Sequence, residues 1–412
     1  MRPVHPRLSP EDSDMIFLLI IGFTAVGIAA FSVSSGALLF GSLFLRKKDT
    51  SSLDPAVIAQ ALDALRKSAD GTSLRGVEMS GASARLAAHL NDKRIMIPLL
   101  EAKLRWFGLC GRKAAVERLF ITGFRRVRLA GYAVEPEAVG FADAPCSALT
   151  ANGTLAGNDT LPANGTLAGN SPRRVALLVH GYSDSAAGMA YLAEEYLKRG
   201  VTVVAVDCRA HGGSGGKLIT MGYTDASDVV DWLAFLTAKY GENTRFILHG
   251  VSMGAAAVLQ SLSLKEFQPF VPNVTAAVAD CGFSSAKEQL ACQIGEIIGA
   301  AAFQRFIGGL VINGMSLVNG LMSGFFLGQD SPVKALRKRR KLPACRIPLV
   351  LFHGDADVMV SPRMANELET AAAGCGVSVA HVPDAPHIGS YFYDPQSYMR
   401  RIFDAIAVRK ID

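Results

Sequence analysis

The segment Gly250-Val251-Ser252-Met253-Gly254 places a serine between two glycines, a spacing that serves nucleophilic catalysis. An apolar run, Phe246–His249, precedes this segment, and a second one, Ala255–Leu259, follows it. A sharp strand-to-helix turn of this kind lifts the serine hydroxyl above a sheet, and the glycines avoid clashes around it. The helix start also offers backbone amides that stabilise negative charge. Ser252 is the predicted nucleophile, and a buried hydroxyl in a tight turn is the structural alternative.

A serine hydroxyl needs a general base, which is most often a histidine. His387 follows Pro383–Pro386, beyond the last predicted strand, where the base lies when the chain order is nucleophile, acid, base. His381 falls within that strand, where we expect a half-buried side chain. We therefore predict His387 as the base. Three other histidines precede a glycine at a strand end and are expected to make supporting hydrogen bonds: His180, His249 and His353.

The third member of a triad orients the imidazole and stabilises its protonated form. Asp355 and Asp357 both follow the apolar run Leu349–Phe352. We favour Asp357 as the acid, because Val358 and Val360 can pack inward and hold the loop beneath it. Asp355 is the alternative, and its expected role is to cap the turn.

Acyl transfer also requires donors for the oxyanion of the tetrahedral intermediate. One donor is the backbone amide after the nucleophile, which here belongs to Met253. The second comes from the loop after an earlier strand, where His180-Gly181 places the amide of Tyr182. The predicted oxyanion hole is therefore formed by Tyr182 and Met253.

These residues require a sheet whose strands end at one common edge. Continuous apolar runs, typical of strands buried on both faces, alternate with helical patterns at 186–199 and 223–240. Alternating strands and helices predict an α/β fold with a mostly parallel, doubly wound sheet. A strand hairpin is expected within 117–134. The predicted parallel strands are Arg174–Val179, Val201–Val206, Phe246–His249, Ala276–Ala279, Leu349–Phe352 and Val377–Ala380.

The motifs of this chain, and the order in which they occur, resemble those of the α/β-hydrolase superfamily, close to its serine aminopeptidase and lysophospholipase-like branch. The resemblance covers about 117–408, and it implies a Ser–Asp–His triad at Ser252, Asp357 and His387, with no metal or organic cofactor. The long N-terminal region and the loop at 136–172 depart from the family pattern. The motifs are His180-Gly181, Asp207-x-Arg-x-His-Gly-x-Ser214, Gly250-x-Ser-x-Gly254, His353-Gly-x-x-Asp357 and His387.

Residues 15–45 contain no charged side chain and are long enough to span a bilayer. They follow a short tail, 1–14, and end at Arg46-Lys47-Lys48. A cleaved signal peptide is the alternative, but its apolar stretch is usually shorter. We predict an uncleaved, single-pass transmembrane anchor.

The side of the membrane that the large domain faces depends on two opposing patterns. The cations that follow residue 45 outnumber those that precede residue 15, and the positive-inside rule then favours the cytoplasmic side. Glycosylation sequons favour the opposite side. The sequons are at Asn152, Asn158, Asn164 and Asn273.

The remaining segments frame the catalytic domain at 116–412. Residues 46–115 predict a helical stalk or collar, and 136–172 form a low-complexity loop with a duplicated octapeptide. Residues 284–342 lie where such enzymes carry a cap. This insertion is apolar, so a second membrane span is the alternative to a cap. The basic run 337–341 after it predicts a solvated surface or contact with anionic lipid.

The composition excludes several other classes of protein. The apolar share of 50% excludes full-length disorder, and a net charge of +6 without interleaved aromatic residues gives no support for nucleic-acid binding. Seven scattered cysteines form no zinc pattern and slightly favour a reducing compartment. We predict a membrane-anchored serine hydrolase for an ester, thioester or peptide substrate. The alternative is a catalytically silent binding or scaffold protein.

Overall fold

In the computed structural model the chain divides into two compact units. The sheet unit consists of 45–289 and 330–412, and the helical unit consists of 1–44 and 290–329. The structure describes residues 32, 34, 54–67, 92–112, 114–139, 172–298 and 302–409, without the side chains of 295–298 and 302–305. The predicted anchor, 15–45, therefore lies outside the described residues except for Ser32 and Ser34, and the loop at 140–171 lies outside them entirely.

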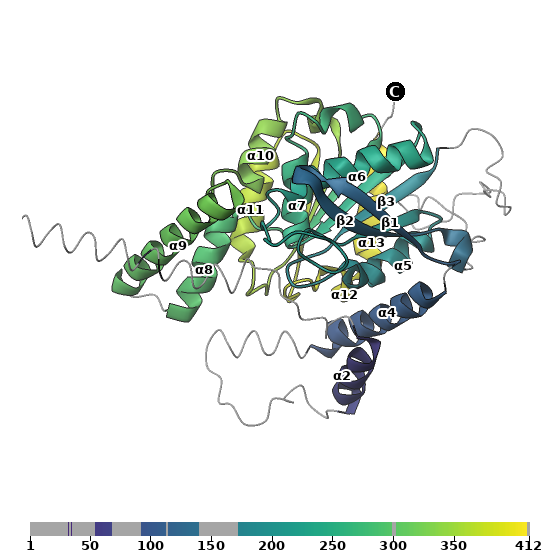
Figure 1. Ribbon diagram of the computed structural model, residues 1–412, viewed down its shortest axis with the longest axis horizontal. Helices are drawn as coiled ribbons and strands as arrows, with labels where there is room; N and C mark the ends of the chain where they lie inside the picture. The colour runs from purple at the N-terminus through teal and green to yellow at the C-terminus, as the bar shows by residue number, and fades with distance from the viewer. Residues whose placement is uncertain are drawn as a thin grey trace, which may run out of the picture. The chain divides into compact units, whose positions relative to one another are not determined.

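The sheet unit is built on an eight-stranded sheet in the order β1-β2-β4-β3-β5-β6-β7-β8 (Figure 1). The strands from β4 to β8 in this order are parallel, whereas β1 and β2 are antiparallel to their neighbours. This confirms the predicted α/β fold with a mostly parallel sheet. The strand bounds are β1 Glu117–Gly123, β2 Val127–Val134, β3 Arg174–Val179, β4 Thr202–Val206, β5 Arg245–Val251, β6 Val274–Asp280, β7 Leu349–Gly354 and β8 Val377–Val382.

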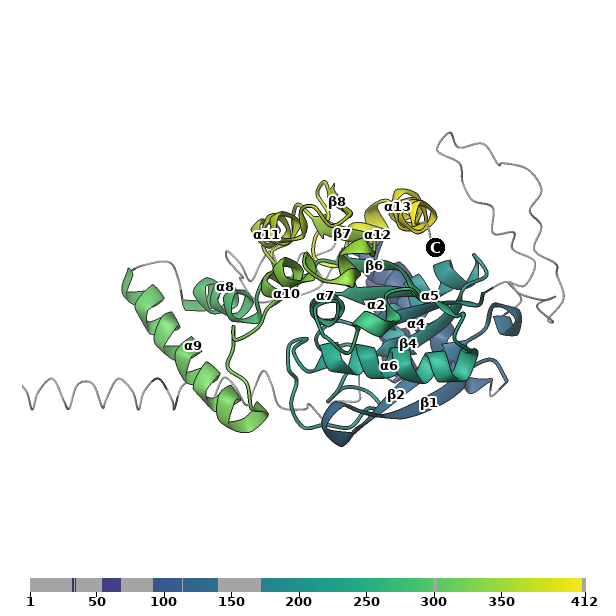
Figure 2. The same ribbon diagram turned by 90° about the horizontal axis from the view of Figure 1, so that it is seen from above.

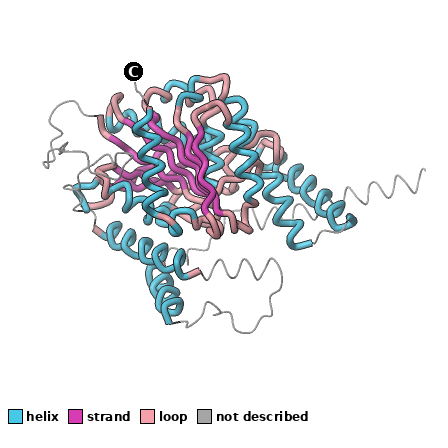
Figure 3. The backbone as a smooth tube through the Cα atoms, turned by 180° about the vertical axis from the view of Figure 1, so that it is seen from behind, coloured by secondary structure: helices cyan, strands magenta, loops and turns pink. Residues whose placement is uncertain are grey.

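Helices cover both faces of the sheet, with the strands enclosed between them (Figure 3). The central strands are buried along their whole length, which explains why they read as continuous apolar runs. One face carries α5 and α13, and the other carries α6, α7, α10 and α11. These helices are α5 Ala190–Leu197, α6 Asp225–Tyr240, α7 Met253–Ser261, α10 Pro332–Arg339, α11 Pro362–Ala372 and α13 Pro395–Val408.

The segment predicted as a stalk or collar forms two helices, α2 (Pro55–Lys67) and α4 (Lys93–Gly111). The carboxylate of Asp54 accepts a hydrogen bond from the amide of Ala56 at 2.8 Å, as its N-cap position predicts. Helix α4 packs into the main core through Trp106, which is 3% exposed and meets Tyr132 of β2 edge-on. It thus extends the helical layer that holds α5.

Four residues of the basic run at 337–341 are exposed, as a solvated run predicts, but Arg339 is an exception. Arg339 is fully buried, and its guanidinium donates to backbone carbonyls, among them those of Ala344 and Cys375. Arg340 donates to the carbonyls at the end of α11. These two side chains therefore connect backbone carbonyls of separate segments of the fold.

A disulfide joins Cys345 and Cys375, which the scattered cysteines did not predict. It links the turn before β7 to the turn before β8, on the side of the sheet where Arg339 is buried. The other described cysteines are not disulfide-bonded: Cys110, Cys208, Cys281 and Cys292. A persistent disulfide is typical of an oxidising compartment, in contrast to the compartment that the odd cysteine count favoured.

The predicted cap at 284–342 is helical. It contains α8 (Ala286–Ile298), the long straight helix α9 (Ala302–Ser323) and α10 (Figure 2). Within the described residues, one helical stretch, Phe306–Ser323 in α9, is long and apolar enough to cross a membrane. Most of the helical unit's described residues belong to α9 and the turn after it.

Candidate active site

Ser252 lies in a strained turn between β5 and α7. Its backbone has φ 54° and ψ −112°, values that a residue with a side chain rarely adopts. The amide of Ser252 donates to the carbonyl of Asp280 at 2.8 Å, which ties the turn to β6. A Cβ atom at Gly250 would collide with the backbone of Gly254, and one at Gly254 would collide with Val179 at the end of β3. Steric exclusion at these two positions explains the glycine spacing around the serine.

His387 lies between Ser252 and Asp357. Its Nε2 atom is 3.0 Å from the Oγ atom of Ser252, and its Nδ1 atom is 2.7 Å from Oδ2 of Asp357. The other carboxylate oxygen of Asp357 accepts hydrogen bonds from the amides of Met359 and Val360, each at 2.8 Å. The structure thus brings the three predicted residues into one hydrogen-bonded chain, although they come from three separate loops.

The two charged members of this chain shift each other's pKa values. Burial favours the neutral form of Asp357, but the imidazole of His387 outweighs burial and holds the carboxyl pKa below its usual value. Burial likewise lowers the pKa of His387, but the carboxylate of Asp357 raises it well above the ordinary value. Asp357 therefore stays ionised and strengthens the basicity of the imidazole.

Asp355, the alternative acid, takes a different position. Its Oδ1 atom is 3.4 Å from Nδ1 of His381, at the exposed edge of the sheet. His381 does lie in β8, but it is exposed and not half-buried as predicted, because β8 is an edge strand. Val358 is 41% exposed, so it does not hold the loop as predicted, whereas Val360 is buried. The loop is held by the hydrogen bonds that Asp357 accepts.

The loop after β3 approaches the serine closely. A Cβ atom built at Gly181 would be 3.3 Å from the Cβ of Ser252, a tight contact that shows how near the two backbones lie. Nδ1 of His180 bonds to the carbonyl of Gly181, and Nε2 accepts from the amide of Cys208. These bonds fix the loop that carries Tyr182. Met253 begins α7 directly after Ser252, and Tyr182 directly follows Gly181, the residue of this loop that approaches the serine.

Lys103 of α4 anchors this same loop, a contact that the sequence did not reveal. Its Nζ atom lies 2.9 Å from Oδ1 of Asp184, two residues beyond Tyr182. Burial raises the pKa of Asp184, but Lys103 outweighs burial, and the net shift is downward. The residues of the pair are 81 positions apart, so no local pattern could have linked them. Helix α4, which lies in the predicted stalk or collar, therefore helps to position the candidate oxyanion hole.

A buried polar chain supports the serine turn from below. The hydroxyl of Tyr196 lies 3.0 Å from Nδ1 of His249, and Nε2 of His249 lies 2.9 Å from the hydroxyl of Tyr398. Tyr398 donates its proton to Asp280 at 2.9 Å, so His249 must carry its own proton on Nε2. Burial lowers the pKa of His249 to about 3, which keeps the ring neutral. As predicted, His249 has a supporting role.

Comparisons with known proteins agree with this geometry. A model of the alpha/beta hydrolase family matches residues 176–401, more than half of the chain. The chain belongs to the alpha/beta hydrolase family. Over 210 residues the hydrolase is 27% identical to a monoacylglycerol lipase of Mycolicibacterium smegmatis, a match that covers 46% of this chain and 72% of that protein.

The fold of a solved esterase structure is similar to that of this chain. An esterase of Pyrococcus furiosus has 19% sequence identity and a TM-score of 0.50, and the match covers 72% of this chain and 92% of that one. An alpha/beta hydrolase of Vibrio vulnificus has 18% identity and a TM-score of 0.49, and covers 82% of this chain and 98% of that one.

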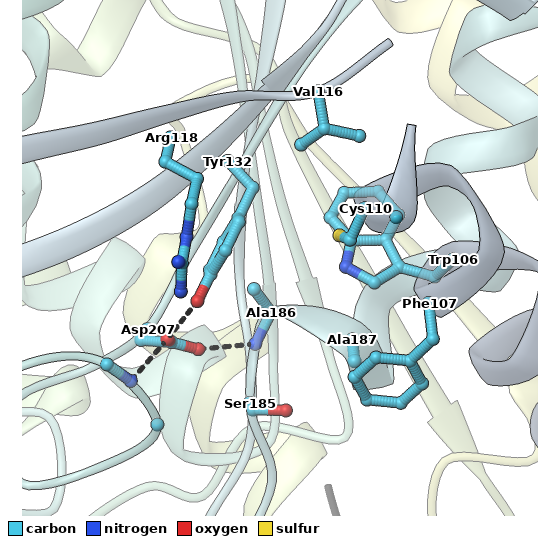
Figure 4. Close-up of a pocket in the computed structure, with 13 residues that line it drawn as sticks. Trp106, Phe107, Cys110, Val116, Arg118, Tyr132, Ser185, Ala186, Ala187 and Asp207 are labelled. Atoms are coloured by element: carbon cyan, nitrogen blue, oxygen red, sulfur yellow. Dashed lines mark hydrogen bonds between the residues drawn. The ribbon is translucent and has the colours of Figure 1, made fainter. Parts of the chain in front are cut away.

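The Asp207 segment of the hydrolase has a structural role. Asp207 accepts hydrogen bonds from the amides of Ala186 and Gly213 at 2.8 Å and from the hydroxyl of Tyr132 at 3.3 Å (Figure 4). It borders a cavity of about 580 Å³ that Trp106 and other apolar side chains line on the opposite wall. No member of the Ser252–His387–Asp357 chain lines this cavity. Within the described residues, no group of three potential ligands is placed to hold a metal ion.

The two aspartates predict different mutant phenotypes. Asp357→Asn removes the charge that orients and stabilises the imidazole, so kcat falls on the order of 10⁴-fold, as in the serine protease case. Because Asp357 raises the pKa of His387, the acid limb of the remaining activity moves to lower pH. Asp355→Asn breaks an exposed pair and costs less than about 1 kcal/mol of stability. Measured kcat–pH profiles and thermal melts test both variants, and the reverse pattern assigns the acid to Asp355.

The contact between Lys103 and Asp184 predicts that a substitution outside the triad lowers kcat. Lys103→Met frees Asp184 and loosens the loop that carries Tyr182, so we expect kcat to fall about tenfold, less than the ~10²–10³-fold lost when an oxyanion donor is removed. Arg105→Met is the matched control, since Arg105 lies on the same helix and pairs with Glu194 of α5. Equal kcat values for the two variants, at equal melting temperatures, contradict a positioning role for Lys103.

Proposed function

We propose that this protein is a serine hydrolase that cleaves an acyl ester, and by the same chemistry a thioester or amide, through an acyl-enzyme on Ser252. The observation that supports this proposal best is the position of His387, within hydrogen-bonding distance of both Ser252 and Asp357. A binding or scaffold protein has no need for a strained serine held against a buried, charge-stabilised imidazole.

In the acylation half of the proposed reaction, Oγ of Ser252 attacks the substrate carbonyl carbon while Nε2 of His387 takes the serine proton. The carbonyl oxygen becomes an oxyanion, and the amides of Met253 and Tyr182 stabilise it. The bond to the leaving group then breaks, and His387 returns its proton to the departing alkoxide. The products are a free alcohol and an acyl-serine.

Deacylation repeats these steps with water as the nucleophile. His387 takes a proton from water, the resulting hydroxide attacks the acyl carbon, and the proton passes to Oγ of Ser252 as the acid departs. Throughout both halves Asp357 remains ionised and stabilises the imidazolium. The lowered pKa of Asp357 keeps its carboxylate ionised beside the imidazole.

The substrate class that we place first is a carboxylic ester. A monoacylglycerol lipase and an esterase are among the proteins to which this chain is similar, and esters are the substrates that their names state. A serine aminopeptidase activity is the alternative within the same mechanism. A panel of p-nitrophenyl acyl esters, acyl-CoA and aminoacyl amides, compared by kcat/KM, separates these classes.

Active-site labelling tests the mechanism directly. A fluorophosphonate probe phosphonylates the activated serine, so we expect the wild-type protein to be labelled and Ser252→Ala to lose both labelling and ester hydrolysis. Ser183→Ala is the control, because Ser183 lies on the neighbouring loop and has no place in the proposed chemistry. Equal labelling of wild type and Ser252→Ala, or no labelling of the folded wild type, favours the scaffold alternative.

We also propose that residues 15–45 anchor the enzyme in a membrane, with the catalytic domain on the cytoplasmic side. The support is the charge-free length of this segment and the cations at 46–48. One specific observation favours the opposite orientation, which is the disulfide between Cys345 and Cys375. The sequon at Asn273 adds little to that alternative, because its side-chain nitrogen donates to the carbonyls of Glu242 and Thr244.

Thiol labelling in intact cells tests the orientation. Val408, which is 78% exposed, is replaced by cysteine in a Cys292→Ser background, since Cys292 is the exposed native thiol among the described residues. With a cytoplasmic domain, a membrane-impermeant maleimide modifies Val408→Cys only after the membrane is opened. Modification in intact cells places the catalytic domain outside the cytoplasm. In that case the disulfide predicts the orientation better than the cations at 46–48 do.

A further inference from the structure

Helix α9 and the turn after it expose large apolar side chains to an unusual extent. In the window Phe306–Ser323 only 39% is buried, and no charged residue occurs between Phe306 and Gln329. Soluble helices normally turn such side chains inward and keep charged ones outside. The exposed side chains, with their exposed fractions, are Phe306 (55%), Leu317 (40%), Leu321 (80%), Met322 (53%) and Phe326 (54%).

Three polar side chains of the same segment, Ser316, Asn319 and Ser323, are turned inward, whereas Asn313 and Gln329 are exposed. Asn319 is fully buried, and its Nδ2 atom donates to the carbonyl of Phe325 at 2.6 Å. Ser323 donates to Oδ1 of Asn319 at 3.1 Å, and Oγ of Ser316 accepts from the amide of Leu327 at 3.0 Å. These three side chains therefore make their hydrogen bonds within the segment, while large apolar side chains face outward. This arrangement suits an environment that offers no hydrogen-bond partners, such as the hydrocarbon core of a bilayer.

Another contact links α9 to the charge-free segment 15–45. The hydroxyl of Ser32 donates to the backbone carbonyl of Leu310. A Cβ atom at Gly314 would collide with the backbone of Ser32, so the glycine permits this close approach. Small residues at a helix contact and serine hydrogen bonds between helices are typical of helices packed within a membrane.

The chain leaves and re-enters the sheet unit at one place. The amide of Val333 donates to the carbonyl of Ser284 at 3.3 Å, so the two ends of the insertion meet. The eight residues 324–331 reach at most about 29 Å when fully extended, and a turn at Phe326–Gln329 shortens them further. They are too short to return across a hydrocarbon core of about 30 Å. Helix α8 is no second span, because it carries Lys287, Glu288 and Glu296.

We propose that α9 and residues 324–329 are immersed in the acyl-chain region of a lipid bilayer, beside residues 15–45, and that this segment enters and leaves by the same face. This inference rests on the membrane anchoring proposed above. It gives the enzyme a second membrane contact, within the insertion that we predicted as the cap of the catalytic domain.

A bilayer fits this surface better than a protein partner does. Protein interfaces combine an apolar centre with a polar rim, whereas the stretch from Phe306 to Gln329 has no charged residue to form a rim. The neighbouring segment in the same unit is itself long enough to span a membrane. Lipid contact therefore accounts for both stretches at once.

Quenching by brominated lipid tests this proposal on the full-length chain. Single variants Leu321→Trp and Phe326→Trp are reconstituted into phosphatidylcholine vesicles with or without bromine atoms on the acyl chains. Phe120→Trp is the matched control, because Phe120 is 44% exposed on β1 and its ring lies under Arg128, a contact that tryptophan retains. Leu39→Trp reports the segment 15–45, and the parent protein supplies the background of Trp106 and Trp232.

In vesicles, we expect the tryptophan added in Leu321→Trp and in Phe326→Trp to emit at shorter wavelength than the one added in Phe120→Trp. We expect brominated lipid to quench the first two strongly. The emission of Phe120→Trp should be the same with and without bromine. Quenching of Leu39→Trp alone overturns the second contact but leaves the anchor intact. Equal emission of Leu321→Trp and Phe326→Trp with and without bromine points to a protein partner or a second copy, and also overturns the proposal. Fluorophosphonate labelling of Ser252 in the same vesicles keeps the test of the catalytic mechanism separate.

Discussion

The close approach of the Ser252 turn to the end of β3 is the constraint on which the rest of the site depends. Gly254 packs against the backbone at Val179, and Gly181 packs against Ser252 itself, so the turn after β5 and the loop after β3 touch with no side chain between them. This contact sets the distance between the nucleophile and the candidate oxyanion donors. A side chain at Gly254 would collide with the backbone at Val179 and push the turn away from β3, whatever became of the histidine and the acid.

The parts of the fold that surround this contact act as supports for it. Asp280 holds the amide of Ser252 through its carbonyl and accepts from Tyr398 and Ser390 through its carboxylate. Because Ser390 lies three residues after His387, the same buried carboxylate braces both the nucleophile turn and the base loop. Burial raises the pKa of Asp280 to about 6, even though these hydroxyl donors favour its charged form. Hydrogen-bonded polar side chains buried beside the apolar strands therefore support both the Ser252 turn and the His387 loop.

How much the sequence could predict depends on how local the physical cause is. The Ser252 turn follows from sterics within five residues, and the parallel sheet follows from apolar runs, so both were predictable. The position of His387 followed from chain order, whereas Asp357 was preferred to Asp355 because Val358 and Val360 were expected to pack inward, and Val358 does not. The contact between Lys103 and Asp184, the burial of Arg339 and the exposure of Val358 depend on segments that meet only in the folded chain, and a single sequence carries no signal of those meetings.

The disulfide between Cys345 and Cys375 closes a covalent ring around the stretch that supplies the acid. This ring, with its ends 30 positions apart, contains β7, the loop with Asp357, and α11. A proteolytic cut at the exposed Asp355 or Val358 would therefore leave two fragments that remain joined. On a non-reducing gel the cut protein would migrate as one chain, and only reduction would separate its two fragments. An inactivated molecule would therefore be indistinguishable from an intact one on such a gel.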